Sequence, residues 1–473
     1  MKLFQPLQIN SMELSNRIVL TAMVTRLSGE DGYVNKDIRD RYIRFAKGEA
    51  GLIVVEAMAV HTAKSGPLLR LCDDSFIPGL RDMAKAVHDC SPSKIVPQII
   101  HFLKIARSGW RQKVQDLTKV EIDQIVINYG DAARRAREAG FDGVELHMAH
   151  AYTLSSFLSQ RNNRNDAYGR SLENRMRLMS EVIVRCREMV GKDFPIGVRF
   201  DGEECIKNGY TVMDSRQIAL RMAQLGIDYI SISAGGKFED AILKAGEPLY
   251  PYTGYSGDRC MPGDTYPDGA NVYIAEGIKS FINSKGYYTP IVTTGKIATP
   301  ELAESILEEG KADMIGMARA LLADPDWPKK VRDGRSDHLI RCIYGNVCKS
   351  LDENFRKVVC TLWPKGSLQA PESDDKVAPI WPQSAELKAK IEVGSVRLTW
   401  NAASDNEGVY GYEIYRAEGD KDFEKWTSVK RLGHWDTGVV GGERYRYYVR
   451  AYDFAGNRSE PSNSVEVAMP FPV

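Results

Sequence analysis

The chain has 473 residues, and its basic and acidic residues number 63 each, so the formal net charge is zero. This balance argues against a nucleic-acid or membrane-surface role driven by net charge, and no run reaches the roughly 18 apolar residues that a membrane span needs. The length predicts two domains, and the hydrophobic and charged fractions, 43% and 27%, are typical of a soluble globular protein.

The N-terminus and the cysteines predict the compartment. Residues Met1–Pro6 lack the apolar run of a signal peptide. Eight cysteines in a chain of this length do not suggest a disulfide framework. We therefore expect a cytoplasmic protein that acts on a small-molecule substrate, with neither nucleic acid nor a membrane as partner. Whether it forms a homo-oligomer is left open.

Short apolar segments alternate with helical patterns along the first two thirds of the chain. Strands are expected at residues 17–23, 52–57, 94–100, 144–146, 196–200, 229–233, 291–295 and 314–317, and helices at 38–47, 77–88, 122–139, 173–190, 215–225, 272–282 and 301–309. The strands are apolar throughout, as in a parallel sheet buried on both faces. This order predicts an α/β fold of the TIM (β/α)8 barrel type. A doubly wound sheet would need a Gly-rich dinucleotide fingerprint after an early strand, and none is present.

The hydrophobic period changes near the C-terminus. We expect the barrel with a C-terminal extension over residues 1–362, a polar, proline-rich linker over 363–379, and a small all-β sandwich over 380–473. In the last segment apolar residues alternate with polar ones, as at Val396, Leu398 and Trp400. The phrases 398–401 and 411–416 resemble bacterial fibronectin type III modules. Such a resemblance implies a spacer or a docking surface, so a protein partner for this module is left open.

The stretch from Ala139 to Arg175 carries the most reactive side chains. His147, His150 and Tyr152 follow a short strand within six residues, in a chain with only seven histidines. The carboxyl ends of the strands are where a barrel places its chemistry. The two histidines could be a metal pair, but no third histidine or carboxylate stands nearby at ligand spacing, so we predict no metal. A polar loop, Arg161–Arg170, leads into the next helix.

The last two barrel strands carry a candidate phosphate site. Gly295 ends the seventh expected strand and Lys296 follows it, and Ala318 and Arg319 follow the eighth. Backbone N–H groups beside small residues, with a guanidinium nearby, suit a phosphate dianion. Gly295 alone would indicate only a turn, whereas Gly295 together with Arg319 at consecutive strand ends favours a phosphate site.

Two phrases carry a family resemblance. Residues 147–152, His-Met-Ala-His-Ala-Tyr, and 168–175, Tyr-Gly-Arg-Ser-Leu-Glu-Asn-Arg, resemble the Old Yellow Enzyme family of FMN-dependent ene-reductases. The resemblance implies one FMN, bound by Thr21, Ala22, Met23, Val24, Ala57, Gln98, Arg199, Gly295, Lys296, Ala318 and Arg319. Within this set it implies Gln98 at the pyrimidine edge of the flavin and Arg199 at its N1/C2-carbonyl edge. Val24, Arg26 and Lys104 depart from residues common in the family.

The resemblance also implies a two-step reaction. NADH or NADPH reduces FMN, and an activated C=C substrate then places its carbonyl oxygen between His147 and His150. Tyr152 protonates the α-carbon. Arg26, together with the long Gly235–Gly269 excursion, is predicted to select an acidic or CoA-linked substrate. The preference between NADH and NADPH and the physiological substrate are left open.

Two alternatives remain beside the ene-reductase. One is an amine dehydrogenase or demethylase on the same fold, and the other is a non-catalytic, flavin-free scaffold. The segments 342–345 and 360–364 resemble the cluster region of the 2,4-dienoyl-CoA reductase branch. Only Cys342, Cys348 and Cys360 stand for its four thiolates, and their spacing is altered. Because a four-iron cluster normally takes four thiolates, we predict no cluster and direct reduction of FMN by NAD(P)H or by a separate protein.

Overall fold

The chain divides into two units in the computed structural model, which describes residues 1–63, 66–104, 112–235, 258–372 and 375–471. One unit comprises Met1–Gly334 and Arg341–Ala370, and the other comprises Arg335–Ile340 and Pro371–Val473. The expected linker, 363–379, straddles this division. Among the described residues, no helix combines the length and the apolar character that a membrane span requires.

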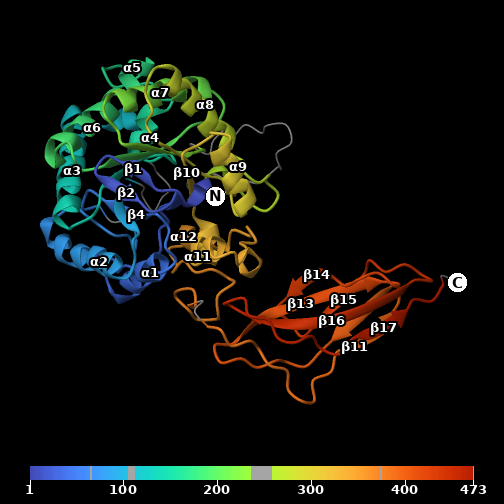
Figure 1. Ribbon diagram of the computed structural model, residues 1–473. Coiled ribbons are helices and arrows are strands. Elements are labelled where there is room, and N and C mark those ends of the chain that lie inside the picture. The colour runs from blue at the N-terminus through green and yellow to red at the C-terminus, as the bar shows by residue number, and fades with distance from the viewer. Residues whose placement is uncertain (64–65, 105–111, 236–257, 373–374, 472–473) are drawn as a thin grey trace. The chain divides into compact units, whose positions relative to one another are not determined.

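The first unit is a closed parallel barrel, so the predicted TIM fold is confirmed (Figure 1). Its strands are β3 (Ile18–Leu20), β4 (Leu52–Ala59), β5 (Lys94–Ile100), β6 (Val144–Met148), β7 (Ile196–Asp201), β8 (Tyr229–Ser233), β9 (Ile291–Thr293) and β10 (Met314–Met317). Strand β10 pairs with β3 and closes the ring. Nearly every strand residue is buried, which explains the continuous apolar runs in the sequence.

Helices surround the barrel (Figure 1). The outer ring is α1 (Lys36–Ala46), α2 (Ile77–Cys90), α3 (Lys119–Glu138), α6 (Arg177–Val190), α7 (Val212–Gln224), α8 (Val272–Ser284) and α9 (Pro300–Glu308). Shorter helices are α4 (Thr153–Leu158), α5 (Leu172–Arg175), α10 (Arg319–Ala323), α11 (Trp327–Arg332) and α12 (Val347–Glu353). Side-chain caps fix several starts: an oxygen of Asn35, Thr118, Thr211 or Thr299 accepts a backbone N–H at the start of α1, α3, α7 or α9.

A short hairpin that the sequence analysis did not predict packs against the barrel strands. It pairs β1 (Leu7–Ile9) with β2 (Met12–Leu14), and its apolar side chains join a core with Val19, Val54 and Tyr229. Gly197 makes room for Tyr229, because a Cβ at this position would lie 2.0 Å from the tyrosine ring. These side chains fill the end of the barrel that the hairpin covers. Space for a ligand therefore lies at the opposite end, where the strands have their carboxyl ends.

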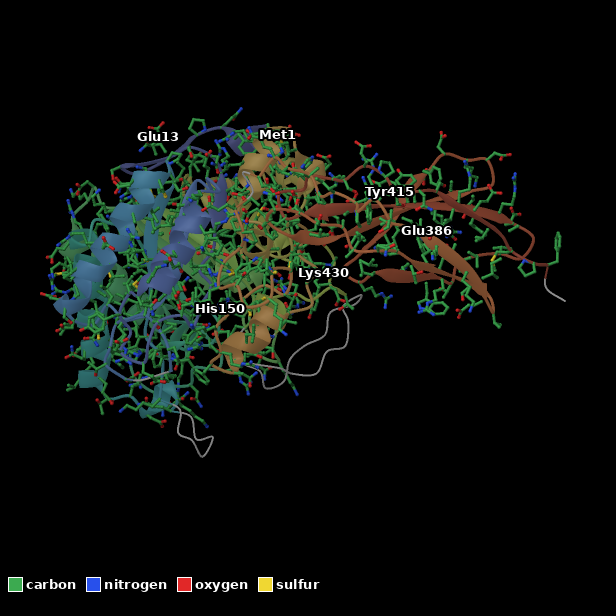
Figure 2. The ribbon with its side chains drawn as sticks, turned by 90° about the horizontal axis from the view of Figure 1, so that it is seen from below. Met1, Glu13, His150, Glu386, Tyr415 and Lys430 are labelled. Atoms are coloured by element: carbon green, nitrogen blue, oxygen red, sulfur yellow. The ribbon has the colours of Figure 1, made fainter. Side chains whose placement is uncertain are left out.

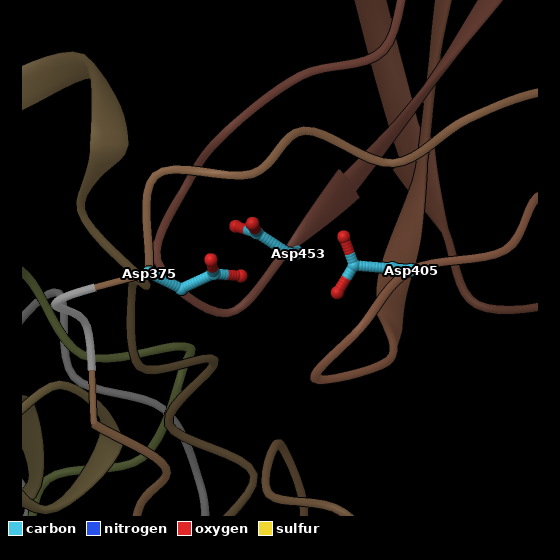
Figure 3. Close-up of side chains that lie close together, drawn as sticks. All are labelled: Asp375, Asp405 and Asp453. Carbon is cyan, nitrogen blue, oxygen red and sulfur yellow. The ribbon is translucent and has the colours of Figure 1, made fainter.

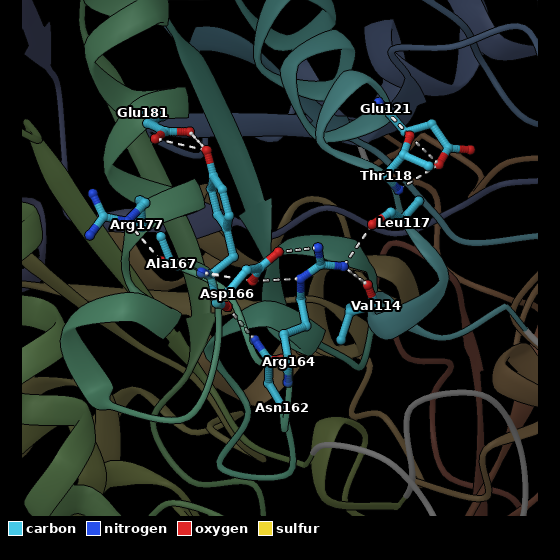
Figure 4. Close-up of polar contacts among 11 residues, drawn as sticks. Val114, Leu117, Thr118, Glu121, Asn162, Arg164, Asp166, Ala167, Arg177 and Glu181 are labelled. Carbon is cyan, nitrogen blue, oxygen red and sulfur yellow. Dashed lines mark hydrogen bonds and ion pairs between the residues drawn. The ribbon is translucent and has the colours of Figure 1, made fainter.

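The polar loop Arg161–Arg170 is held by hydrogen bonds to neighbouring helices and loops (Figure 4). The Arg164 guanidinium donates to the carbonyl of Leu117 at 2.8 Å and pairs with Asp166. The Tyr168 hydroxyl donates to Glu181 at 3.0 Å. The loop is therefore tied to the start of α3 on one side and to α6 on the other.

The part of the second unit that spans Pro371–Val473 is all β, as predicted. A three-stranded antiparallel sheet contains β11 (Lys388–Glu392), β12 (Ser395–Thr399) and β15 (Gly433–Asp436), and a four-stranded one contains β13 (Val409–Glu418), β14 (Glu424–Val429), β16 (Arg444–Asp453) and β17 (Val465–Ala468). Alternate residues of both sheets, such as Leu398, Ile414 and Tyr447, form one core. Tyr415 of β13 is labelled in Figure 2. The fibronectin-like character stays a prediction.

Three carboxylates converge in the second unit (Figure 3). Asp375, Asp405 and Asp453 each offer an oxygen within 4.8 Å of the others. Burial and the two neighbouring carboxylates raise the pKa of Asp453, against the hydrogen bonds that Asn457 donates. One oxygen each of Asp375 and Asp405 is buried without a hydrogen-bond partner. Repulsion within this cluster therefore costs stability when all three groups are ionised.

Asp405→Asn tests this repulsion. Oδ1 of Asp405 accepts the N–H groups of Glu407 and Gly408, so an asparagine can keep both bonds and direct an amide N–H at the other carboxylates. We expect a stabilisation of about 1 kcal/mol at pH 7, measured by calorimetry of the full chain in a chelating buffer. The gain should shrink as the pH falls and Asp453 becomes protonated. Exposed Asp422→Asn is the control, and a loss of stability at neutral pH would contradict the repulsion.

Candidate active site

Histidines gather at the carboxyl-terminal mouth of the barrel. His147 lies in β6 and His150 just after it, while His61 follows β4 and His101 follows β5. The rings of His61 and His101 are 4.4 Å apart, and burial lowers their pKa values to about 4 and about 3. Sequence reasoning missed this second pair, although His101 directly follows the predicted strand 94–100 and His61 lies four residues beyond the predicted strand 52–57.

His147 is a neutral hydrogen-bond donor. Only 4% of the residue is exposed, and burial, with a smaller effect of Arg199, lowers its pKa to about 3. Its Nδ1 accepts the N–H of Ala149 at 3.1 Å, which assigns the ring proton to Nε2. No partner of Nε2 is present among the described residues, so this N–H is available to a ligand.

His150 and Tyr152 lie beside His147. The His147 ring is 5.2 Å from that of His150 and 4.9 Å from that of Tyr152, edge to face in both cases. His150 has a left-handed backbone, with φ of 59°, and lies in the barrel unit (Figure 2). Burial, then the charges of neighbouring His147 and Arg199, would hold the pKa of His150 well below its ordinary value. The structure thus brings together the three predicted catalytic residues as two neutral imidazoles and a phenol.

A polar network fills the barrel interior below them. Gln98 donates to Glu145 at 2.7 Å, and the Tyr229 hydroxyl donates to the same carboxylate at 3.1 Å. Arg199 donates to Ser231 at 2.9 Å and to Ser233 at 3.2 Å. Burial raises the pKa of Glu145, opposed first by the Arg199 charge. Sequence reasoning missed Glu145, although a carboxylate within an apolar strand is itself a signal.

The predicted FMN-binding residues lie at different places relative to the barrel strands. Ala57, Gln98 and Arg199 lie within β4, β5 and β7, each two residues before the end of its strand. Ala57 lies where the pairing of β4 with β5 shifts register. Gly295 lies beyond β9, which ends at Thr293. Thr21 is buried after β3, and Ala22, Met23 and Val24 are half-buried beside it.

The predicted phosphate end holds a buried guanidinium. Arg319 is 6% exposed, donates to the Pro262 carbonyl at 2.8 Å and to Asn346, and stacks on Tyr344 at 4.8 Å. No carboxylate of the described residues pairs with it. The Lys296 ammonium is instead engaged with the carbonyls of residues 264 and 266 and with Asp268.

These groups fit FMN. One cavity is lined by Thr21, Arg199, Gly295, Ala318 and Arg319 together. It therefore joins the group predicted for the ring edge to those predicted for the phosphate. A Cβ at Gly316 would lie 2.5 Å from Thr294 and 2.9 Å from Thr21, so a side chain at this position would collide with both threonines that line the cavity. A buried guanidinium without a carboxylate is the partner that a phosphate requires.

Other predicted groups lie around this site. Arg26 pairs with Asp352 at 2.7 Å and stacks on Phe355 at 4.6 Å, so an acidic substrate would compete with Asp352 for it. Residues 236–257 of the predicted selecting excursion lie outside the described residues. Cys342, Cys348 and Cys360 form neither a disulfide nor a metal-ligand group among the described residues. The absence of a cluster stays a prediction.

The closed parallel barrel carries neutral histidine donors near its middle strands and a candidate anion site after its last two strands. This arrangement is typical of a flavin-dependent barrel oxidoreductase. The chain belongs to the NADH:flavin oxidoreductase / NADH oxidase family, whose sequence profile matches residues 2–108 and 102–338. The cofactor of this family is FMN, and its members use NADH or NADPH.

The chain matches relatives that are much longer than itself and relatives that it covers almost completely. The chain is 35% identical to an NADH oxidase of Thermoanaerobacter brockii over 80% of this chain and 58% of that one. It is 33% identical to an NADPH dehydrogenase of Geobacillus sp. over 69% and 92%. A 2-naphthoyl-CoA reductase structure aligns with a TM-score of 0.66 and 25% identity, over 76% and 56%. The chain thus spans little more than half the length of several relatives that it matches.

Arg319→Gln tests the phosphate site. Losing a buried charge-assisted contact should weaken FMN binding by about 2 kcal/mol, or about 30-fold. Binding of riboflavin, which lacks the phosphate, should change little. Flavin fluorescence titration of the apoprotein measures both. Lys296→Gln is the matched control, because its ammonium is already engaged by carbonyls, and an equal loss for FMN and riboflavin would remove Arg319 from the phosphate.

Proposed function

We propose that the flavin-loaded protein reduces a C=C bond conjugated to a carbonyl or thioester, with electrons from NADH or NADPH. The observation that carries this proposal is the packing of two neutral imidazoles, His147 and His150, against the phenol of Tyr152. FMN, when bound, supplies hydride transfer. The likeness to an acyl-CoA reductase structure supports a carbonyl-bearing substrate.

The two histidines would bind the carbonyl oxygen. As hydride reaches the β-carbon, negative charge develops on that oxygen, and donors aimed at it stabilise the enolate-like state. Both donors are neutral because burial opposes the imidazolium form, so they can stabilise this charge without giving up a proton. Preorganised neutral donors also avoid the cost of burying two cations beside Arg199.

Tyr152 would complete the reduction. Its ring lies against His147, at the first turn of α4, and places a phenol next to the carbonyl-binding pair. A phenol is a weak acid that can protonate the α-carbon of an enolate and take its proton back from water. The oxygen donors and the proton donor would thus be separate groups, each acting at a different substrate atom.

Tyr152→Phe separates the two half-reactions. Without the phenol, reoxidation of the reduced protein by an enone should slow about 100-fold or more, whereas reduction by NADH should change little. Anaerobic stopped-flow absorbance follows both. Enones, enoyl-CoA thioesters and amines are offered separately. Reduction of the flavin by an amine in place of NADH, without reoxidation by an enone, would favour the amine dehydrogenase alternative. Equal losses in both half-reactions would remove the role of Tyr152.

His147→Asn tests the neutral-donor assignment through pH. A histidine whose folded pKa is lowered to about 3 binds a proton more readily when unfolded, so it costs stability as the pH falls below about 6. The cost approaches about 1.4 kcal/mol per pH unit until His147 itself protonates. The asparagine keeps a donor but does not titrate, so denaturant unfolding should be less acid-sensitive. Identical acid sensitivity in both proteins would contradict burial of a neutral His147.

A further inference from the structure

His150 is held by two side chains that the proposed mechanism does not use. Ser233, the last residue of β8, is 1% exposed, and its Oγ lies 2.7 Å from His150 Nε2. Asp201, the last residue of β7, is fully buried, and its Oδ2 accepts the His150 backbone N–H at 2.7 Å. Asp201 and Ser233 are register partners in the barrel, so one rung of the sheet carries both contacts.

The hydroxyl of Ser233 has a defined direction. The Arg199 guanidinium can only donate, and its Nη2 lies 3.2 Å from Ser233 Oγ, which therefore accepts. The remaining partner of the hydroxyl is His150 Nε2. If Nε2 carried the ring proton instead, the buried Ser233 proton would have no acceptor among the described residues. Satisfying all three groups requires Ser233 to donate to Nε2, which leaves the proton of His150 on Nδ1.

Asp201 supports the same arrangement. It accepts the His150 N–H together with the Ser155 hydroxyl, at 3.1 Å, and so holds His150 in its left-handed conformation. Its Oδ1 lies 3.9 Å from Nε2 and has no hydrogen-bond partner. Burial raises the pKa of Asp201 well above its ordinary value, with Glu204 adding to the rise and Arg199 opposing it. At this distance Oδ1 cannot accept a hydrogen bond from Nε2, so Asp201 does not hold the ring proton there.

We propose that Ser233 and Asp201 are positioning residues that fix the tautomer and orientation of His150, so that Nδ1–H is the group presented to the substrate oxygen. This inference rests on the proposed function for the identity of that oxygen. The contacts form a chain in which Arg199 donates to Ser233, Ser233 donates to His150, and His150 donates to the ligand. His147 supplies its second donor through Nε2, as its contact with Ala149 requires.

The tautomer is measured directly on the flavin-loaded full chain. Labelling with ¹⁵N-histidine gives a small set of ring signals, because the chain has 7 histidines. The signals missing from His150→Gln belong to His150. We expect a protonated Nδ1 in the wild type, a shift of the proton towards Nε2 in Ser233→Ala, and recovery of the wild-type signals in Ser233→Thr. A protonated Nε2 in the wild type would overturn the proposal.

Ser231→Ala is the matched control. Ser231 lies on the same strand and accepts from the same guanidinium, at 2.9 Å from Nη1, without touching His150. Its loss should leave the His150 signals in place. If Ser231→Ala and Ser233→Ala change them alike, the effect comes from Arg199 and the positioning role of Ser233 is wrong.

Binding of 4-nitrophenolate, whose oxygen resembles an enolate oxygen, is the second readout. At a pH where this phenol is ionised, calorimetry should show about tenfold weaker binding to Ser233→Ala than to the wild type. The reason is that, without Ser233, the Nδ1–H of His150 is no longer held towards the phenolate oxygen. Asp201→Asn keeps an acceptor oxygen for the His150 N–H and should bind as the wild type does, while Asp201→Ala should bind more weakly. 4-Nitroanisole, which lacks the anionic oxygen, should not distinguish the variants.

The outcomes separate the two proposals. If the phenolate does not bind the wild type, the oxygen site of the proposed function fails, while the ¹⁵N signals still decide the tautomer. If the phenolate binds the wild type and Ser233→Ala equally, the proposed function stands and the positioning role fails. Weak binding to Asp201→Asn would show that an ionised Asp201 is required and would overturn its assigned part.

Discussion

A guanidinium inside a barrel is the constraint on which the site depends. Arg199 is 7% exposed and fully charged in any accessible pH range, so its surroundings must adapt to it. Its charge favours ionisation of Glu145, which Gln98 and Tyr229 then satisfy by hydrogen bonds. The same charge adds to the effect of burial in opposing protonation of His147 and His150. One buried residue thus influences both the polar interior and the histidines above it.

The sequence predicted what local patterns determine. Each barrel strand is a run of apolar residues, and each long helix has a periodic apolar face, so their order defined the barrel before any contact was known. His147, His150 and Tyr152 were found because they are neighbours in the chain. Ser233 and Asp201 were not, because each acts on His150 from a different strand, 83 and 51 residues away. Their roles depend on sheet register, which no local pattern encodes.

The most family-specific phrase in the chain is mainly structural. The segment containing Arg164, Tyr168 and Arg175 makes its contacts with backbone carbonyls and with α6, and Arg175 donates to the Leu158 carbonyl at 2.6 Å. These bonds fix the chain between α4 and α6, and α4 begins next to Tyr152. A long, distinctive motif can therefore identify a family through its scaffold, while the residues proposed for the chemistry precede it.

The two buried guanidinium groups of the barrel show how electrostatics divides the site. Arg199 faces a carboxylate supplied by the chain itself, Glu145, and is stabilised before any ligand arrives. Arg319 meets only neutral acceptors and an aromatic ring among the described residues. A buried cation without an internal anion is costly, and that cost is relieved when a ligand brings the missing charge. The anionic end of the ligand should therefore lie at Arg319, which leaves Arg199 to the predicted ring edge and, through Ser233, to His150.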